Sequence, residues 1–437
     1  MKRVEFVRKL LIVLVTLILV AAASIALFNT SKDVVSAEVD LIFEVGELML
    51  SNNLHSMAIA EDGSLWGWGD NHYGAVGNGT NFNEPNLNTS TLFYMPRFLF
   101  ADVDLSLHAE PLPINIKDGV VYVSAGSSHT MAITKDGKLW GWGNNWNSQV
   151  SGGSETESII PIYLYINGRT VYGGTRESEP VISTPVHIKD NVAHVAAGRT
   201  HTMAVTDDGR LWGWGNNWAG VLGDGTDENR YSPVYIKSNV VFVSTSSSHT
   251  MAITKDGSLW GWGSNFSGEL GDGTTTRQYS PIHIMDNVVY VSAGPGYTMA
   301  ITEDRRLWGW GHNWTGVLGD GTTRNRRRPI HIMDNIVYVS AGPVHVMAIT
   351  SDGALWGWGA NDLGELGSGS RRRMQRRPIH IKNNVISVSA GSGYTTAITA
   401  DGNLWAWGFN RGGQLGDGTL TNRHRPVLIM SLQADVE

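Results

Sequence analysis

The sequence predicts an all-β fold, a seven-bladed β-propeller made of four-stranded antiparallel blades. First, the string LWGWG, written LWAWG in its last copy, begins at residues 65, 139, 211, 259, 307, 355 and 404. Second, successive copies lie 74, 72, 48, 48, 48 and 49 residues apart, which is typical of a repeat protein with two enlarged units. Third, each unit contains short runs rich in Val, Ile, Tyr and Trp, separated by Gly, Pro, Asp and Asn clusters, as strands are.

The unit that starts at residue 280 shows the expected elements in order. Its four strands are SPIHIM, DNVVYVSAG, PGYTMAIT and EDRRLWGWG, and the loop HNWTGVLGDGTT follows. No segment between them is long enough for a helical crossover, so we expect an antiparallel meander. An Asp-Gly turn joins the third and fourth strands in most copies, for example at Lys135–Gly137. In the fifth unit Asp304 is followed by Arg305, so this turn is expected to be of a different type or mildly strained.

The tryptophan pattern indicates how the units pack. Strand alternation places Trp260 and Trp262 on one face and Leu259, Gly261 and Gly263 on the other. Fourteen of the 17 tryptophans lie in these strings, so we interpret them as repeated wedges and not as a ligand cage. The strand glycines are expected to admit the aromatic face of the adjacent unit.

The two ends of the repeat array are complementary. An open solenoid would need atypical capping units, and none is visible. The last unit finishes with an additional strand-like segment, Arg425–Met430, whereas the first unit has no clear equivalent before Glu47–Leu50. We therefore expect the C-terminal strand to complete the N-terminal blade and close the ring.

The repeats resemble those of the regulator of chromosome condensation family. The resemblance is carried by GSSHTMAI at Gly126–Ile133, LWGWGNN at Leu211–Asn217 and GELGDG at Gly268–Gly273, and it spans residues 40–430. It implies a seven-bladed propeller. It does not select a function, because family members include a nuclear nucleotide-exchange factor, ubiquitin-ligase modules and secreted bacterial β-lactamase inhibitors.

Composition limits the function classes. The chain has 437 residues and a formal net charge of −7, which argues against a general nucleic-acid-binding surface. It has no cysteine, which excludes disulfides, thiolate metal sites and a cysteine nucleophile.

The N-terminal segment, residues 1–37, is interpreted as a signal peptide or a signal-anchor. A basic start precedes the apolar run Leu10–Phe28, and Val35–Ala37 supplies small residues for cleavage after Ala37. Left uncleaved, residues 10–28 approach the length that spans a bilayer. Either outcome places the propeller, residues 38–437, outside the cytoplasm, and the pattern is typical of a bacterial protein that is extracellular or on the cell surface.

Two repeated patterns suggest metal sites but have simpler interpretations. One repeat position is filled by His55, His129, His201, His249 and His345, and by Tyr297 and Tyr394. The exchange with tyrosine favours structural hydrogen bonding within each blade over metal ligation. The Gly-Asp-Gly loops at 223, 271, 319 and 416 are attributed to turn chemistry, because Asn78 and Ser368 replace the aspartate elsewhere. We expect no catalytic residues, no metal and no cofactor.

Sequence differences between units point to an arginine-rich sector. Three successive loops, at 323–329, 371–378 and 422–426, contain eleven arginines and are equivalent loops of successive blades. They are Arg324, Arg326, Arg327, Arg328, Arg371, Arg372, Arg373, Arg376, Arg377, Arg423 and Arg425. The fold places such loops side by side on one face, where guanidinium groups favour phosphate or carboxylate partners. The alternative is a solvated rim that only keeps the protein soluble. Without interleaved aromatics, nucleic acid is a poor candidate partner.

Two insertions, at residues 81–113 and 151–180, account for the enlarged units. The first contains Phe98 and Phe100, and the second contains Tyr163 and Tyr165 in IYLYINGRTVY. The second reads as a hairpin turning at Asn167-Gly168. Because projecting apolar hairpins need a surface to cover them, these four aromatics are candidate anchors for a partner. The alternative is that the two insertions cap each other.

The sequence therefore predicts a non-enzymatic, exported protein-interaction module that binds a protein or an anionic surface ligand of the cell envelope. The expected contacts are the insertions and the arginine sector, a monomer is expected, and the membrane contact would be residues 10–28. Three alternatives stay open: an inhibitor of an extracellular enzyme such as a β-lactamase, an extracellular polysaccharide-active enzyme, and a guanine-nucleotide exchange factor by family analogy.

Overall fold

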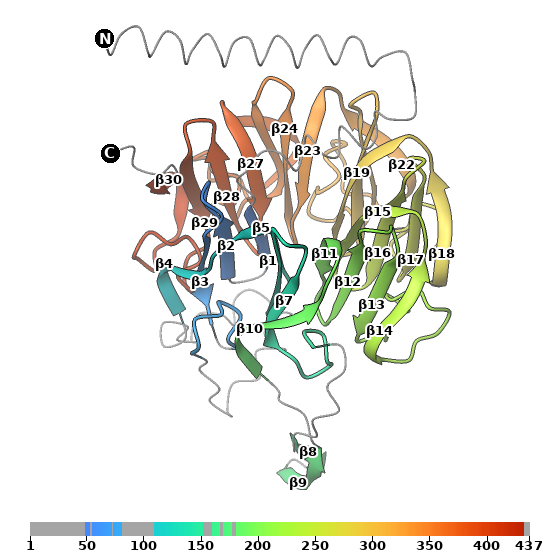
Figure 1. The fold of residues 1–437 in the computed structure, drawn as a ribbon. Coiled ribbons are helices and arrows are strands. Elements are labelled where there is room, and N and C mark those ends of the chain that lie inside the picture. The colour runs from blue at the N-terminus through green and yellow to red at the C-terminus, as the bar shows by residue number, and fades with distance from the viewer. Residues whose placement is uncertain are drawn as a thin grey trace, which may run out of the picture. The chain divides into compact units, whose positions relative to one another are not determined.

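The computed structural model describes residues 49–52, 55–71, 73–80, 109–151, 160–166, 169–176 and 181–431. Residues Val45–Glu437 form one compact unit. Its described strands include seven four-stranded sheets, in which neighbouring strands pair antiparallel (Figure 1). This confirms the prediction of an all-β propeller with seven blades. Residues 1–37, interpreted above as an export segment, lie outside the described residues.

Each blade uses its strands in chain order from the centre of the ring outward, and we number the blades 1–7 along the chain. The innermost strands are β1 (Met49–Asn52), β5 (Val120–Ala125), β11 (Val192–Ala197), β15 (Val240–Thr245), β19 (Val288–Gly294), β23 (Ile336–Ala341) and β27 (Val385–Ala390). The second strands are β2 (His55–Ile59), β6 (His129–Thr134), β12 (His201–Thr206), β16 (His249–Thr254), β20 (Tyr297–Thr302), β24 (His345–Thr350) and β28 (Tyr394–Thr399).

The third strands carry the LWGWG strings. They are β3 (Leu65–Asp70), β7 (Leu139–Asn144), β13 (Leu211–Gly215), β17 (Leu259–Gly263), β21 (Leu307–Gly311), β25 (Leu355–Ala360) and β29 (Asn403–Gly408). The outer strands are β4 (Ala109–Lys117), β10 (Val181–Lys189), β14 (Arg230–Lys237), β18 (Gln278–Met285), β22 (Arg326–Met333), β26 (Met374–Lys382) and β30 (Arg423–Ser431). Two further strands, β8 (Ile160–Ile166) and β9 (Arg169–Arg176), form a separate hairpin.

The predicted order of strands within a blade was wrong. The run SPIHIM was expected to be the first strand of its blade, but β18 is the outer strand of blade 4 and pairs with β17. The next run begins blade 5 as β19, after a link of only two residues, Asp286 and Asn287. The Asp-Gly turns therefore join second and third strands. A proline in each outer strand, such as Pro281, explains the placement, because an edge strand tolerates a residue without an N–H group.

The predicted mode of ring closure was also wrong. β30 pairs with β29 inside blade 7 and does not complete blade 1, which has its own innermost strand β1. Instead the ring closes by packing, because β1 contacts β27 just as every other innermost strand contacts its neighbours (Figure 1). Closure needs no exchanged strand because each blade is complete within one continuous stretch of chain.

Hydrogen bonds between blades 7 and 1 seal this junction. The Tyr394 hydroxyl donates to the carbonyl oxygen of His55 at 2.8 Å and accepts a hydrogen bond from the Ser56 hydroxyl at 2.9 Å. The Trp68 indole N–H donates to the Gln414 carbonyl oxygen at 2.9 Å. All five residues are buried, so each bond is made away from competing water.

Replacing Tyr394 with phenylalanine is expected to lower the free energy of unfolding by about 1–3 kcal/mol, because it leaves a buried carbonyl and a buried hydroxyl without this partner. Chemical denaturation measures the loss. Tyr297→Phe should cost a similar amount, since the Tyr297 hydroxyl donates to the Gly342 carbonyl at 2.6 Å across the junction of blades 5 and 6. The half-exposed Tyr235 supplies the control, and an equal effect of Tyr235→Phe would contradict the assignment.

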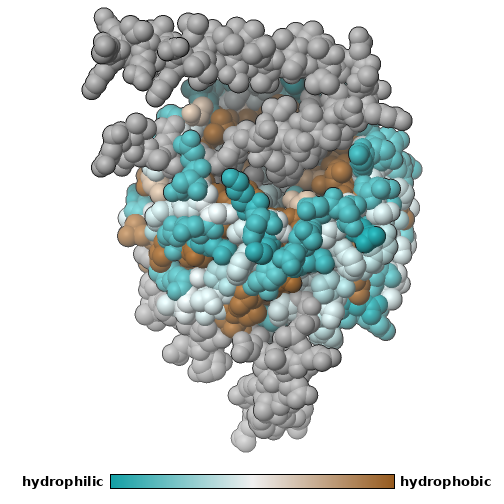
Figure 2. All heavy atoms as spheres, in the orientation of Figure 1, coloured by the Kyte–Doolittle hydropathy of each residue, from teal (hydrophilic) through white to brown (hydrophobic). Residues whose placement is uncertain are grey.

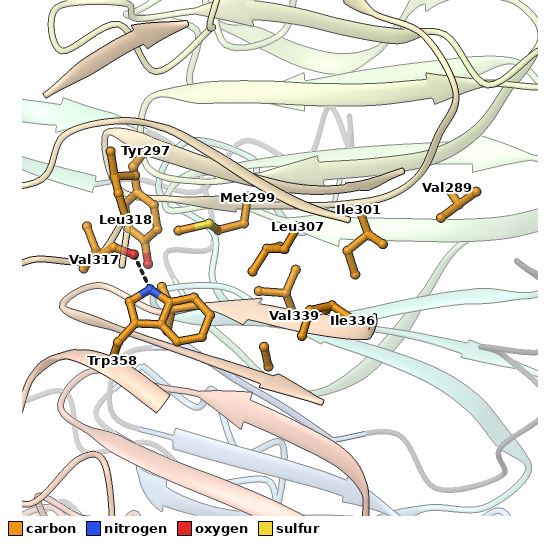
Figure 3. Packing of buried hydrophobic residues seen from close by; sticks show 12 residues of the cluster. Val289, Tyr297, Met299, Ile301, Leu307, Val317, Leu318, Ile336, Val339 and Trp358 are labelled. Atoms are coloured by element: carbon orange, nitrogen blue, oxygen red, sulfur yellow. Dashed lines mark hydrogen bonds between the residues drawn. The ribbon is translucent and has the colours of Figure 1, made fainter. Parts of the chain in front are cut away.

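The second tryptophan of each string is the wedge between blades. Trp358 of β25 is fully buried, and its indole N–H donates to the carbonyl oxygen of Val317 in the preceding blade at 2.7 Å. Figure 3 shows the ring beside Val317 and Leu318, below Tyr297 and Met299 of β20. The other six such tryptophans make the same bond to the preceding blade, at 2.8–3.1 Å.

The wedge prediction is confirmed, but the glycines that admit the indoles were misassigned. The Trp358 ring lies against Gly319 in the loop of blade 5, where an added Cβ would stand 2.9 Å from the indole nitrogen. The strand glycine Gly357 instead faces Met347 of its own blade, whose sulfur would lie 2.9 Å from such a Cβ. The strand glycines therefore make room for a methionine, and the loop glycines make room for the tryptophan.

The Arg305 turn keeps the conformation that glycine adopts in the other blades. Its φ is +61°, close to +74° at Gly137 and +78° at Gly257. Of the two expectations for this turn, mild strain is the correct one, because a residue with a Cβ is held in the left-handed region.

Candidate functional site

The loop between the third and fourth strands is the part of each blade that varies most. Because the strands are antiparallel, these loops leave every blade at the same end, which we call the loop face, and the Asp-Gly turns lie at the opposite end, the turn face. Neighbouring loops are linked, since the Gly273 N–H in blade 4 donates to the Arg327 carbonyl in blade 5 at 2.8 Å. Both insertions and all eleven arginines belong to this set of loops and to the outer-strand ends that follow them.

The structure separates the arginines into two groups. Arg326 and Arg423 are half-buried and ion-paired, with guanidinium nitrogens 2.6 Å from Asp320 and 2.7 Å from Asp417. Arg230 makes the same pair with Asp224 in blade 3. These arginines fasten a Gly-Asp-Gly loop to the outer strand of its own blade, so Arg326 and Arg423 do not belong to a free binding surface.

The same pairs explain the Gly-Asp-Gly loops. Burial alone would raise the pKa of Asp320, but hydrogen bonds from Arg326 and Thr322 outweigh it and hold that pKa below its usual value. The Asn313 amide also donates to Asp320, at 3.1 Å. Each aspartate of this kind is thus occupied by donors of its own loop, in agreement with the interpretation as turn chemistry. Among the described residues no group of three or more His, Asp or Glu side chains is arranged to hold a metal ion.

The other nine arginines are exposed at the ends of blades 5, 6 and 7. Three of them reach across the junction to the preceding blade, where each guanidinium lies over a loop glycine: Arg328 over Gly273, Arg377 over Gly321 and Arg425 over Gly369. Arg373 lies 3.8 Å from Asp362, on a side chain that is 91% exposed. The remaining five are Arg324, Arg327, Arg371, Arg372 and Arg376.

The exposed arginines give this sector a local positive charge. Within the described part of the chain, none of the exposed arginines except Arg373 is ion-paired with a carboxylate. Among the described residues, eight cationic side chains therefore stand on equivalent loops of three consecutive blades without an ion-paired carboxylate to neutralise them. Such a sector favours a carboxylate or phosphate partner even though the whole chain is acidic.

Two of the four predicted anchors in the insertions lie on a described strand. Phe98 and Phe100 lie outside the described residues. Tyr163 and Tyr165 lie on β8, which pairs antiparallel with β9, so the predicted hairpin is present. The first insertion ends earlier than the predicted boundary at residue 113, because residues 109–117 already form the outer strand β4.

The repeated histidines are structural: their Nε2 atoms contact the next blade, and the expected bond within a blade is also present at His249, whose Nδ1 lies 2.9 Å from the Ser246 hydroxyl. His249 Nε2 lies 2.9 Å from the Thr298 hydroxyl of the next blade, and His345 Nε2 lies 2.7 Å from Thr395. His55 and His129 make the equivalent contacts to Thr130 and Thr202 at 2.9 and 3.0 Å, whereas His201 Nε2 lies 2.6 Å from Thr245 on the innermost strand of the next blade. Burial lowers the pKa of His55 to about 4 and of the other four to about 3, because the charged imidazolium would be desolvated.

The innermost strands carry aromatic rings where an axial active site would need carboxylates. Tyr122, His194, Phe242, Tyr290 and Tyr338 follow one another on five consecutive blades, with ring centroids 4.4–5.1 Å apart. This continuous file of stacked rings offers no pair of acids, so it gives no support to a polysaccharide-active site at the centre of the ring.

Sequence reasoning missed a group of exposed aromatics on the loop face. Trp146, Trp218, Phe266 and Trp314 occupy one loop position on blades 2–5 and are 52%, 68%, 69% and 71% exposed. A signal for them was available, since three of them are the three tryptophans that lie outside the LWGWG strings. The described surface in Figure 2 is otherwise mainly hydrophilic or intermediate, with small hydrophobic areas.

A model of the RCC1-like domain matches residues 102–437, and a model of the regulator of chromosome condensation (RCC1) repeat matches residues 62–133. The ultraviolet-B receptor UVR8 of Arabidopsis thaliana is 32% identical over 180 residues, which are 40% of this chain and 30% of that protein. The human E3 ubiquitin-protein ligase HERC2 is 28% identical over 168 residues, 38% of this chain and 3% of the ligase. The match thus spans less than a third of either curated relative.

Among solved structures, yeast RCC1 (Prp20) in its complex with Kap60 has a TM-score of 0.66 with this chain. The two are 18% identical, and the superposition covers 89% of this chain and 86% of the yeast protein. At this level of identity the likeness concerns the fold alone.

Proposed function

We propose, from the premise that this chain belongs to the RCC1-like domain family, that it acts as a protein-interaction module without catalytic activity of its own. The propeller is a rigid ring whose blades differ mainly in the loops of one face, and loops on a rigid scaffold are where binding residues concentrate. The complex of yeast RCC1 with Kap60 supports the idea that this fold offers surfaces to proteins.

The observation that carries the proposal is the set of eight exposed arginines without an acidic neighbour among the described residues. Guanidinium groups bind carboxylates through two parallel hydrogen bonds, so the partner surface is acidic. Blade 7 adjoins blade 1 in the ring, which makes the arginine sector continuous with the blades that carry the two insertions. The insertion aromatics Phe98, Phe100, Tyr163 and Tyr165 are proposed as the apolar anchors of the same contact.

The partner is proposed to lie outside the cytoplasm. Residues 1–37 carry the basic start, the apolar run and the small residues of an export segment. In the part of the chain that the structure describes, no helical segment has the length and apolar character to traverse a bilayer. N-terminal sequencing of the protein after expression in an exporting host tests the proposal: a chain that starts near Glu38 supports cleavage, and a membrane-bound chain that starts at Met1 supports the anchor.

Replacing Arg327, Arg328, Arg376 and Arg377 together with serine is expected to weaken capture of the partner at least tenfold and to remove its dependence on salt. Charge pairs at the rim of an interface speed association and are screened by salt, so their loss removes both effects. The measurement is a pull-down from an envelope fraction at low and at raised ionic strength. Arg326 stays unchanged, because removing it would leave Asp320 without its ion-pair partner.

In a matched control, serine replaces Lys135, Arg210, Lys255 and Arg306, which removes four positive charges from the turn face. This variant has the same net charge but keeps the sector, so it should capture the partner as the natural chain does. Equal loss in both variants would show a general charge effect, and unchanged capture by the sector variant would refute the role of the arginines. Capture of no protein by the natural chain would refute the proposed function itself.

A further inference from the structure

The exposed aromatics of the loop face form an arc that the proposed arginine contact does not use. Trp146, Trp218, Phe266 and Trp314 stand at one position on blades 2, 3, 4 and 5, and each is more than half exposed. Large aromatics gain most when they are buried, so four of them in solvent on neighbouring blades are costly for a chain that only has to fold. The opposite half of the face, blades 6 and 7, has Asp362 and Arg411 at this position.

One arginine is held in the middle of this arc. The Arg277 guanidinium carbon lies 5.4 Å from the ring centroid of Trp218, 5.6 Å from that of Phe266 and 5.9 Å from that of Tyr279. One of its nitrogens donates to the Trp218 carbonyl and to the Tyr279 hydroxyl, both at 3.5 Å. The guanidinium is thus oriented by three rings from two blades, at the junction between blades 3 and 4.

Arg277 differs from the structural arginines of the equivalent loops. Arg230 and Arg326 are neutralised by a loop aspartate, whereas within the described residues no carboxylate is ion-paired with Arg277. Its Nε and second terminal nitrogen make no hydrogen bond to the described residues, and these are the atoms that would bind a carboxylate. A fixed cation between two exposed rings has the chemistry of a receptor for an acid that is flanked by apolar groups.

We propose that Trp218, Phe266 and Arg277 form a peptide-binding site that takes a segment of a partner protein with an Asp or Glu beside large apolar side chains. The carboxylate binds Arg277, and the apolar side chains pack on the Trp218 and Phe266 rings. This contact rests on the proposed function only in taking the partner to be a protein. It adds a second, sequence-selective point of attachment on the same face.

Charge on the neighbouring loop favours a peptide over a nucleic-acid strand. A strand would need a cation near every phosphate along the stacked bases. The loop that carries Trp218 instead presents the exposed carboxylates Asp227 and Glu228, and Arg230 on this loop is already paired with Asp224. A peptide with a single acid reaches Arg277 without bringing further negative charge to these groups.

The test uses fluorescein-labelled peptides with Leu-Glu-Phe, Phe-Glu-Leu or Phe-Asp-Phe at the centre of a Gly-Ser scaffold, each with a matched peptide that has Gln or Asn in place of the acid. The full chain is expected to bind at least one acidic peptide about tenfold or more tightly than its amide counterpart. Arg277→Gln and Arg277→Lys should abolish this preference, because both lose the planar fork. Trp218→Ser and Phe266→Ser should weaken binding of the acidic and the amide peptides alike.

Arg210→Gln on the turn face removes the same charge and should leave binding unchanged. Thermal melting of each variant checks the fold, which should be retained because the replaced side chains are exposed or half-buried. The proposal is overturned if the amide peptides bind as well as the acidic ones, if Arg277→Gln keeps the preference, or if none of the peptides binds. Tighter binding of an oligothymidylate, or self-association that Trp218→Ser abolishes, would equally overturn it in favour of a nucleic-acid strand or a second copy of the chain.

Failure here is distinguishable from failure of the proposed function. If the envelope partner is captured equally by the natural chain and by Trp218→Ser and Arg277→Gln, the proposed function is supported and the peptide site is refuted. If the natural chain captures no partner but discriminates between the peptides, the peptide site is supported and the proposed function is refuted.

Discussion

Replacing Trp358 with alanine is expected to lower the free energy of unfolding by about 3–5 kcal/mol, as would the same change at any of the seven wedge tryptophans. The indole is fully buried at the junction of blades 5 and 6, and it donates the hydrogen bond to Val317. Alanine leaves a cavity between two blades and an unpaired carbonyl as well. Chemical denaturation followed by circular dichroism measures the change.

Trp314→Ala is the matched control, because it removes the same side chain from the neighbouring loop where it is 71% exposed. Its effect should stay within about 0.5 kcal/mol. Gly319→Ala alters the partner of the same indole. Its new Cβ would stand 2.9 Å from the Trp358 indole nitrogen, on a residue with a φ of +74°, so this variant should also lower the free energy of unfolding. A small loss for Trp358→Ala, comparable to the control, would contradict the wedge as the element that joins the blades.

The fold was predictable because one apolar string recurs seven times at nearly constant spacing, and a sheet that small has to pack against its neighbours. The strand at which each blade begins was not predictable from the repeat alone, because a repeating pattern can be divided into units at any point. The information was present in Pro281 and its equivalents, which mark an edge strand. Read in that way, β30 would have been assigned to the outside of blade 7 and no strand exchange would have been expected.

The interpretation of the Gly-Asp-Gly loops as turn chemistry was confirmed because donors to Asp320 lie in its own loop, whereas the particular ion pair and the contacts between blades were missed. The pairing of Arg326 with Asp320 joins residues six positions apart, yet it follows from loop geometry that the sequence does not display. The His249 bond reaches Thr298, 49 residues away, because equivalent positions of neighbouring blades meet. The role of Arg277 depends on Trp218 and Phe266 meeting at a junction between blades, which sequence spacing alone does not specify.

Acidification is expected to unfold the propeller well above the pH at which carboxylates titrate. Burial lowers the pKa of six histidines to about 3–4: His55, His129, His194, His201, His249 and His345. In the unfolded chain each imidazole binds a proton near its ordinary value of 6.5. Between these values the unfolded state binds more protons than the folded state, so stability is full above pH 6.5 and falls as the pH drops toward 4.

The size of the effect follows from the number of histidines involved. Each contributes about 1.4 kcal/mol per pH unit inside this window, so six of them lose about 8 kcal/mol per unit, comparable to the whole stability of a typical domain. Denaturation profiles at pH values from about 7.5 to 4.5 should show the midpoint falling steeply below pH 6. A profile that stays flat down to pH 4.5 would contradict buried, neutral imidazoles.

A single substitution separates this effect from a general acid response. His194 lies between Tyr122 and Phe242, with ring centroids 4.8 and 4.4 Å away, and the next blade has Phe242 at the same position. His194→Phe should therefore fit the file of rings and reduce the pH slope by about 1.4 kcal/mol per unit, so the variant gains stability over the natural chain as the pH falls. Equal slopes for the natural chain and His194→Phe would mean that His194 does not resist protonation in the folded ring.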